Sequence, residues 1–297
     1  MEKCSPSLPT SLFRGMRLTL HLVNGILLAV IYPHLNQARQ THAIRNWSLR
    51  LLAILNIGIR IKGKQPTRSE GGCLMVSNHI SWLDIFVMNA IQPARFIAKA
   101  EVRGWPLIGW LCRRGGTLFI SRSQRQDASK VSRRVSHLLK QGACIGLFPE
   151  GTTTDGKQVG HFHSALIQPA ISAGARLCPM ALRYLDEREE TGSAAAFIGD
   201  TTLVQSIWRI LRSPHLNAQV MFTPALMAAN MNRRVLAQAA QDAIAQQLKM
   251  MGPVRKKPEE ASSALLQTNL QIGLPQADQP QASGRFKSGD LSPHFEI

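Results

Sequence analysis

Short apolar runs alternate with helical patterns from residue 72 to about residue 250. Strands separated by helices of ordinary length favour an α/β fold with a mostly parallel sheet that is covered by helices on both faces. The apolar runs predict strands over 73–77, 95–99, 117–121, 144–148, 177–183, 195–199 and 217–223. The segments between and after them predict helices over 82–90, 105–114, 127–141, 163–174, 203–212 and 231–249.

Before this region, the chain has an uncharged apolar segment. No Asp, Glu, Lys or Arg occurs from Leu18 to Tyr32, and Arg14 and Arg17 come just before it. The run resembles a signal peptide, but no small-residue cleavage site follows it. It is also shorter than the roughly 20 residues that cross a bilayer. A tilted or re-entrant anchor is therefore the favoured interpretation.

A second apolar segment, residues 43–64, has large apolar residues at helical spacing among several arginines and lysines. These apolar residues are Trp47, Leu51, Leu55 and Ile59. The pattern is typical of an amphipathic helix at a membrane surface. A helix packed on the protein's own core would show the same pattern, and that alternative stays open. With the preceding segment it predicts a membrane-associated helical hairpin over residues 14–64.

The composition at the two ends of the chain differs from that of the middle. Residues 1–13 contain Pro and Ser without a clear pattern, and the sequence beyond Pro253 is rich in Gln, Ser, Pro and Ala. Such segments bury too little apolar surface to fold. We therefore expect disorder over 1–13 and 253–297, with an α/β domain over 65–252.

The net charge points to an anionic partner. The chain has 35 Lys and Arg against 18 Asp and Glu, which gives +17. It has only two tyrosines and no arginine-rich run with interleaved aromatic residues, so we predict no nucleic-acid partner. A membrane surface with anionic lipids fits better. The five cysteines include no C-x-x-C pair, which favours a reducing, cytosol-facing location.

The stretch from Asn78 to Asp84 lies where a predicted strand ends and a helix begins, a usual place for chemistry in α/β folds. Residues five apart in one helix point about 140° away from each other. His79 and Asp84 therefore meet only if His79 is on the loop and Asp84 is in the first turn of the helix. Ser81 is a suitable N-cap for that break. Ser81-x-x-Asp84 is also close to a capping box, in which Asp84 only satisfies a backbone N–H.

Two further strand ends carry polar residues. The strand predicted over 117–121 ends at Arg122, which suits a phosphate or carboxylate but also fits a solvated surface position. The strand over 144–148 runs into Pro149 and Glu150, followed by Gly151 and three threonines. A simple turn explains the proline and the glycine, but it does not explain a carboxylate at the strand end beside a cluster of hydroxyls.

Other motifs narrow the chemistry. His161 and His163 have no evident third ligand nearby, so we predict no metal site and no cofactor. The chain lacks G-x-S-x-G, which disfavours a serine hydrolase of the elbow type. It also lacks the G-x-x-x-x-G-K-[ST] of a P-loop nucleotide site.

Taken together, these stretches resemble the blocks of the glycerolipid acyltransferase family, and their order and spacing are similar to those of its 1-acyl-glycerol-3-phosphate acyltransferases. The likeness covers roughly residues 45–225. Its blocks are Asn78-His79-x-Ser81-x-x-Asp84, the segment 96–101, Gly116-x-x-Phe119-Ile120-x-Arg122, Phe148-Pro149-Glu150-Gly151-Thr152 and the proline-bearing strand 177–181. Thr153 stands where the family usually has an arginine associated with the acceptor's phosphate. In this respect the chain looks more like the branch that acylates lyso-ornithine lipid.

The resemblance implies transfer of an acyl group from acyl-ACP or acyl-CoA to the free hydroxyl of a lysolipid, at the cytoplasmic face of a bacterial inner membrane. It implies 1-acyl-glycerol-3-phosphate first and lyso-ornithine lipid second as acceptor. His79 would be the general base and Asp84 its partner. The acceptor's head would be held by Glu150, Gly151 and Thr152, with positive charge from Lys99 and Arg122. A non-catalytic membrane-binding protein on the same fold is the alternative. The intact His79–Asp84 pair argues against it.

Overall fold

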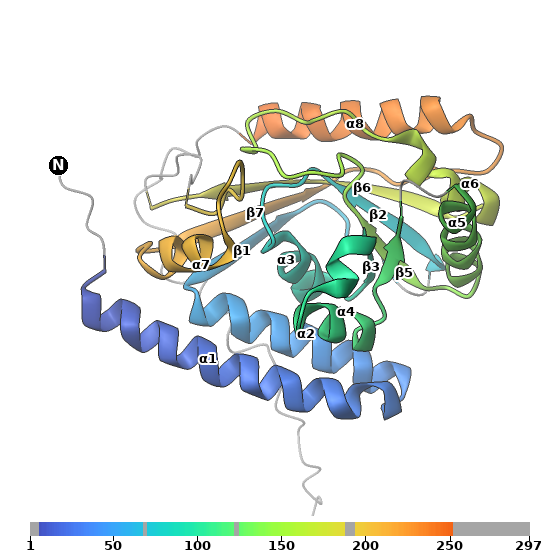
Figure 1. Ribbon diagram of the computed structural model, residues 1–297. Coiled ribbons are helices and arrows are strands. Elements are labelled where there is room, and N and C mark those ends of the chain that lie inside the picture. Colours follow the sequence, from blue (N-terminus) through green and yellow to red (C-terminus); the bar gives the residue numbers. More distant parts are fainter. Residues whose placement is uncertain (1–5, 68–69, 122–124, 188–193, 252–297) are drawn as a thin grey trace, which may run out of the picture. The chain divides into compact units, whose positions relative to one another are not determined.

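The computed structural model describes residues 6–67, 70–121, 125–187 and 194–251 (Figure 1). Within these ranges the strands form one sheet in the order β1-β7-β6-β2-β5-β3-β4, and β8 pairs with β6. The strands are β1 (Ile57–Lys62), β2 (Cys73–Ser77), β3 (Arg95–Lys99), β4 (Leu118–Ile120), β5 (Cys144–Leu147), β6 (Arg176–Leu185), β7 (Leu216–Phe222) and β8 (Leu226–Met227).

The sheet is mostly parallel, as the sequence predicts. Among the described strands, β2 pairs in parallel with β5 and β6, β3 with β4 and β5, and β1 with β7. The pairings of β6 with β7 and with β8 are antiparallel. Every residue of β2 is buried, as expected for a central strand that is covered on both faces.

Helices cover both faces of the sheet, and a separate apolar cluster lies on each face. One cluster joins the sheet to residues of α1, α2, α3 and α7, and the other joins it to residues of α5, α6 and α8. The helices are α1 (Leu8–Ile31), α2 (Gln37–Ile54), α3 (Asp84–Ile91), α4 (Ile108–Arg114), α5 (Arg125–Lys140), α6 (Gln168–Ala173), α7 (Leu203–Leu211) and α8 (Arg233–Met250). Three short 3₁₀ segments are η1 (Tyr32–His34), η3 (Ala100–Gly104) and η4 (Ser164–Leu166).

The N-terminal segments differ from the sequence-based expectation in two ways. Helix α1 begins at Leu8, so part of the stretch expected to be disordered is helical. The helix expected to run to Lys64 ends at Ile54, and the following residues form β1 at the edge of the sheet. The alternating sequence Ile57-Gly-Ile-Arg-Ile-Lys has the period of a strand, and pairing with β7 outweighs its fit to a helical pattern.

The apolar face of α2 packs on the protein itself. Leu51 and Leu55 are each only 1% exposed and belong to the core cluster beneath the sheet, and Trp47 packs against that cluster. The alternative of a helix packed on the protein's own core therefore holds for this segment. Helix α2 also lies along α3, the helix that begins with Asp84 (Figure 1).

Helix α1 presents a long apolar stripe to its surroundings. Its members recur every three or four residues and are between 50% and 63% exposed: Leu12, Met16, Leu20, Val23, Leu27 and Val30. Leu18, on the opposite side, is buried in the core cluster. Among the described residues, the segment Leu8–His34 is the one helix that is long and apolar enough to cross a membrane.

Three smaller expectations also need correction. Residues 195–199 form no strand; Phe197 instead donates its backbone N–H to the carbonyl of Ile80. The helix expected over 163–174 is broken into η4 and α6, and the one expected over 105–114 begins only at Ile108. In the first case, the hydrogen bond to Ile80 satisfies the backbone N–H of Phe197, so this apolar run does not need a partner strand in the sheet.

Candidate active site

The polar residues singled out in the sequence follow neighbouring parallel strands. His79 comes after β2, Glu150 after β5 and Lys99 at the end of β3, and β2, β5 and β3 are adjacent in that order. The carboxyl ends of parallel strands meet at one edge of a sheet, where open α/β folds bind ligands. Arg122, which follows β4, lies outside the described residues.

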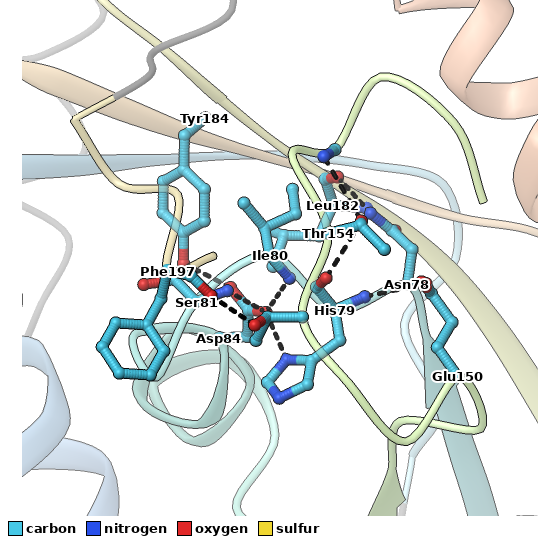
Figure 2. Close-up of polar contacts among 12 residues, drawn as sticks. Asn78, His79, Ile80, Ser81, Asp84, Glu150, Thr154, Leu182, Tyr184 and Phe197 are labelled. Atoms are coloured by element: carbon cyan, nitrogen blue, oxygen red, sulfur yellow. Dashed lines mark hydrogen bonds and ion pairs between the residues drawn. The ribbon is translucent and has the colours of Figure 1, made fainter. Parts of the chain in front are cut away.

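His79 and Asp84 are in direct contact (Figure 2). The imidazole Nδ1 lies 2.7 Å from Oδ2 of Asp84. His79 is on the loop after β2, and Asp84 is the first residue of α3. This is the arrangement that the five-residue spacing requires. Because a carboxylate only accepts hydrogen bonds, Nδ1 carries the proton, which leaves Nε2 as the basic nitrogen.

Asp84 is fully buried and accepts four hydrogen bonds. Besides the imidazole, Oδ2 accepts from the backbone N–H of Ile80 (2.7 Å) and of Ser81 (2.9 Å). Oδ1 accepts from the hydroxyl of Tyr184 at 2.8 Å. Asp84 thus satisfies backbone N–H groups and binds the imidazole at the same time. Ser81 contributes only its backbone here, since the residue before α3 is Leu83 and the helix has no side-chain N-cap.

The imidazole of His79 rests on an aromatic stack. Its ring lies 4.0 Å from the ring of Phe148, centroid to centroid, with only 10° between the planes. Phe148 in turn stacks on Phe96 of β3 at 6.0 Å. Gly146 of β5 leaves room for Phe96, because a Cβ there would lie 2.4 Å from a carbon of that ring. The His79 side chain still keeps 19% of its surface exposed. The ring is therefore held by packing and remains partly accessible to solvent.

The backbone around His79 is held by two other segments of the chain. Its N–H donates to Oε1 of Glu150 (3.0 Å), and its carbonyl accepts from the N–H of Thr154 (2.8 Å). The side chain of Asn78 makes two hydrogen bonds to the backbone of Leu182. Figure 2 shows these contacts converging on the loop from β6 and from the segment after β5. The imidazole is therefore oriented by fixed backbone as well as by Asp84.

Glu150 is a second buried carboxyl at this edge. Burial raises its pKa to about 7, and the backbone N–H groups of His79 and Gly160 act in the opposite direction. Its exposed fraction is only 5%. The structure therefore gives Glu150 a contact that the sequence did not predict, with the backbone of the proposed base. Its contact with an acceptor stays a prediction.

The other predicted substrate-binding residues that the structure describes are less buried than Glu150. Lys99 and Thr152 are exposed, and Gly151 adopts a positive φ of 68° in the turn after β5. Thr153 turns its hydroxyl toward the carbonyl of Phe197 and donates a hydrogen bond to it. No group of three or more His, Cys, Asp or Glu suited to a metal ion occurs among the described residues.

The sequence analysis missed Tyr184, the residue that donates to Oδ1 of Asp84. It stands 100 residues after Asp84, one position beyond the strand predicted over 177–183, and the structure places it in β6. A polar hydroxyl in an otherwise apolar strand is a signal, since a buried tyrosine usually finds a hydrogen-bond partner. The sequence alone does not reveal which partner that is.

Comparisons with known proteins identify the family of the chain. A family model described as Acyltransferase matches residues 58–183. The chain is 37% identical over 201 residues to a lyso-ornithine lipid O-acyltransferase of Pseudomonas aeruginosa, covering 67% of this chain and 76% of that protein. It is 38% identical over 184 residues to a 1-acyl-sn-glycerol-3-phosphate acyltransferase of Neisseria meningitidis, covering 62% of this chain and 71% of that protein.

The fold also has a solved counterpart. The crystal structure of the 1-acyl-sn-glycerophosphate acyltransferase PlsC of Thermotoga maritima matches with a TM-score of 0.58 at 18% identity. The match covers 82% of this chain and the whole of that one. At this identity the likeness supports the fold, while the relatives at 37% and 38% identity carry the assignment. The chain therefore belongs to the acyltransferase family.

Proposed function

We propose that this protein transfers a fatty acyl group from an acyl thioester, either acyl-ACP or acyl-CoA, to the free hydroxyl of a lysolipid. The observation that carries the proposal is the 2.7 Å contact between Nδ1 of His79 and Oδ2 of Asp84, in a His79 side chain that is 19% exposed. An imidazole oriented in this way by a carboxylate is suited to act as a general base.

The proposed reaction proceeds by direct transfer. Nε2 of His79 takes the proton from the acceptor hydroxyl as its oxygen attacks the thioester carbonyl. Asp84 stabilises the imidazolium that forms, as the carboxylate does in a Ser-His-Asp triad. When the carbon–sulfur bond breaks, the imidazolium returns the proton to the leaving thiolate. The products are a diacyl lipid and a free thiol, and no acyl-enzyme is formed.

For the acceptor we place 1-acyl-glycerol-3-phosphate first. The exposed Lys99 at the end of β3, Arg122 in the chain after β4 and the net charge of +17 all favour an anionic head group. One observation favours lyso-ornithine lipid: Thr153 replaces the arginine associated with phosphate, and its hydroxyl is engaged with Phe197. Both acceptors also occur among the names of the similar proteins.

We also propose that the protein works on a membrane, at the cytoplasmic face of a bacterial inner membrane. The exposed apolar stripe on α1 supports the attachment, since a contiguous apolar surface of this kind marks a membrane or protein contact. The excess of basic residues suits the anionic lipids of such a surface.

The test uses the full-length protein in mixed micelles or liposomes with labelled acyl-ACP and acyl-CoA. 1-Acyl-glycerol-3-phosphate (lysophosphatidate), lyso-ornithine lipid and other lysolipids are offered side by side as acceptors. We expect a labelled diacyl product and release of free thiol, with lysophosphatidate the better acceptor. Product from lyso-ornithine lipid alone would reverse the order of acceptors. Absence of acyl transfer to any lysolipid, with protein shown to be folded, would overturn the proposal.

A further inference from the structure

The hydroxyl of Tyr184 and the carboxylate of Asp84 form a buried hydrogen bond between two parts of the chain that are far apart in the sequence. Tyr184 is 1% exposed and Asp84 is fully buried, and the hydroxyl donates to Oδ1 at 2.8 Å (Figure 2). Of the four hydrogen bonds to Asp84, this is the one that comes from outside the Asn78–Asp84 stretch.

We propose that Tyr184 is a positioning residue for acyl transfer, whose hydroxyl fixes the carboxylate of Asp84 so that Oδ2 faces His79. This inference rests on the proposed function of the His79–Asp84 pair. A carboxylate can rotate about its last side-chain bond, and Oδ2 alone has three donors to satisfy. A fourth donor on Oδ1 defines the plane of the group and stabilises its negative charge.

Tyr184 is itself rigidly placed. It lies in β6, where it pairs with Ala218 of β7, and the two hydrogen bonds from Asn78 to Leu182 tie β6 to the loop that carries His79. Burial and the nearby Asp84 raise the pKa of Tyr184 well above its ordinary value. The phenol therefore keeps its proton, and with it its role as donor, throughout the pH range in which the enzyme would work.

In the proposed mechanism, the negative charge of Asp84 stabilises the imidazolium of His79. Without the phenol, Oδ1 is left buried without its donor, and the carboxylate charge is less well stabilised. Such a carboxylate holds a proton more tightly, either on itself or through the imidazolium beside it. Both effects move the acidic limb of the activity profile in the same direction, to higher pH.

The first variant is Tyr184→Phe, assayed with saturating and limiting lysolipid. We expect kcat to fall about tenfold or more, the range for loss of a hydrogen bond to a charged group. We expect the KM values for both substrates to stay unchanged and the acidic limb of kcat/KM to move to higher pH. The control is Thr223→Val, which removes a buried hydroxyl that donates to the carbonyl of Pro179 (3.1 Å) and is not one of the four donors to Asp84. That variant should keep the wild-type pH profile even if its Tm falls.

A second measurement does not depend on how well Tyr184→Phe folds. The chain contains only two tyrosines, Tyr32 and Tyr184. A Tyr32→Phe protein grown on monofluorinated tyrosine therefore carries the label at Tyr184 alone. A fluorinated phenol is a stronger hydrogen-bond donor, so the acidic limb should move to lower pH, opposite to the shift in Tyr184→Phe. The unlabelled Tyr32→Phe protein is the reference.

The outcomes separate this inference from the proposed function. Loss of activity in His79→Ala and Asp84→Asn, with an unchanged kcat and pH profile in Tyr184→Phe, would overturn the role of Tyr184 alone. Full activity in His79→Ala and Asp84→Asn would overturn the proposed mechanism, on which the role of Tyr184 rests, whereas absence of acyl transfer in the wild-type protein would overturn the proposed function. In an Asp84→Asn background, Tyr184→Phe should cause little further loss of kcat, whereas a purely structural role predicts the same loss in both backgrounds.

Discussion

The side-chain amide of Asn78 pairs with the backbone of Leu182 as a neighbouring strand would. Its Nδ2 donates to the carbonyl of Leu182 at 2.9 Å, and its Oδ1 accepts from the N–H of the same residue at 2.8 Å. Backbone pairing of β2 with β6 ends at Ser77 and Met180, so the amide continues the contact where the main chain turns away. The loop with His79 is thereby held at a defined place along β6.

This pairing predicts the effect of Asn78→Asp. The carboxylate keeps an acceptor for the N–H of Leu182 but places a second oxygen against its carbonyl in a fully buried position. We expect a loss of about 1–3 kcal/mol or more in the free energy of unfolding, measured by denaturant titration, and reduced acyl transfer. The control is Asn232→Asp, because Asn232 uses only its oxygen, to cap α8 through the N–H of Arg234. An equal loss in both variants would contradict this account.

His79→Ala should remove acyl transfer without unfolding the protein. A general base contributes roughly a hundred- to ten-thousand-fold, and the kcat of the variant should fall within that range. Circular dichroism and a thermal melt check that the variant is folded. His137→Ala, at an exposed position of α5, is the matched control and should keep wild-type turnover. Near-full turnover in His79→Ala would exclude the proposed mechanism.

Glu150→Gln should change how stability depends on pH. Burial raises the pKa of Glu150 from 4.5 to about 7, so between these values the folded protein keeps a proton that the unfolded chain has released. The contribution of Glu150 to stability is therefore fully present below about pH 4.5 and is lost as the pH rises through 7.

The glutamine variant lacks this dependence, while its side-chain oxygen can still accept from the backbone of His79. Relative to the wild type, it should gain stability from pH 4 to pH 8, by up to about 3 kcal/mol. Denaturant titrations at a series of pH values measure the difference. Glu101→Gln, at an exposed position in η3, should show no such trend. A constant difference between Glu150→Gln and wild type would refute the raised pKa.

Replacing leucines on the exposed stripe of α1 should weaken membrane binding without unfolding the domain. In Leu12→Gln/Leu20→Gln/Leu27→Gln, each lost leucine is worth about 1.5–3 kcal/mol if fully buried in lipid. We expect liposome binding to fall about a hundredfold or more in flotation assays. High salt should weaken only the basic component of binding. The control, Val235→Gln/Met250→Gln, changes exposed apolar residues of α8 and should still float.

Thr153→Arg tests the choice of acceptor. An arginine there offers a bidentate contact to the phosphate. Such a contact is worth on the order of 1.5–3 kcal/mol, or about ten- to a hundred-and-fifty-fold in affinity or rate. If the lack of an arginine at position 153 limits binding of the acceptor's phosphate, the variant should gain activity on lysophosphatidate and not on lyso-ornithine lipid. Thr153→Val removes the hydrogen bond to Phe197 without adding a charge, so it separates the two effects. Strong wild-type activity on lysophosphatidate, unchanged by the arginine, would show that other groups hold the phosphate.

The sequence predicts the part of the site that depends on local spacing. The strand before His79, the helix that begins with Asp84 and the break between them all follow from the apolar run and the five-residue interval. The turn after β5 is likewise marked by Pro149 and Gly151. Such features are determined by neighbouring residues, so a single sequence contains the information.

Features that depend on pairing between segments far apart in the chain cannot be predicted from a single sequence in the same way. Tyr184 meets Asp84 only because β6 extends past the end of β2, and the sequence contains no sign of that register. The antiparallel pairing of β6 with β7 and the edge position of β1 also depend on contacts between segments far apart. For β1 a local signal existed, in the period of two from Ile57 to Lys62, but the basic residues favoured an amphipathic helix.

The short connection between α2 and β1 has a consequence for how the enzyme would meet its substrate. Helix α2 ends at Ile54 and β1 begins at Ile57, so no flexible tether separates the N-terminal helices from the sheet. Helix α2 also packs along α3, whose first residue is Asp84. If α1 lies in the lipid, the proposed base, His79, is held at a fixed height above it. We then expect the enzyme to select lysolipids by how far the hydroxyl stands from the bilayer surface, as well as by the chemistry of the head group.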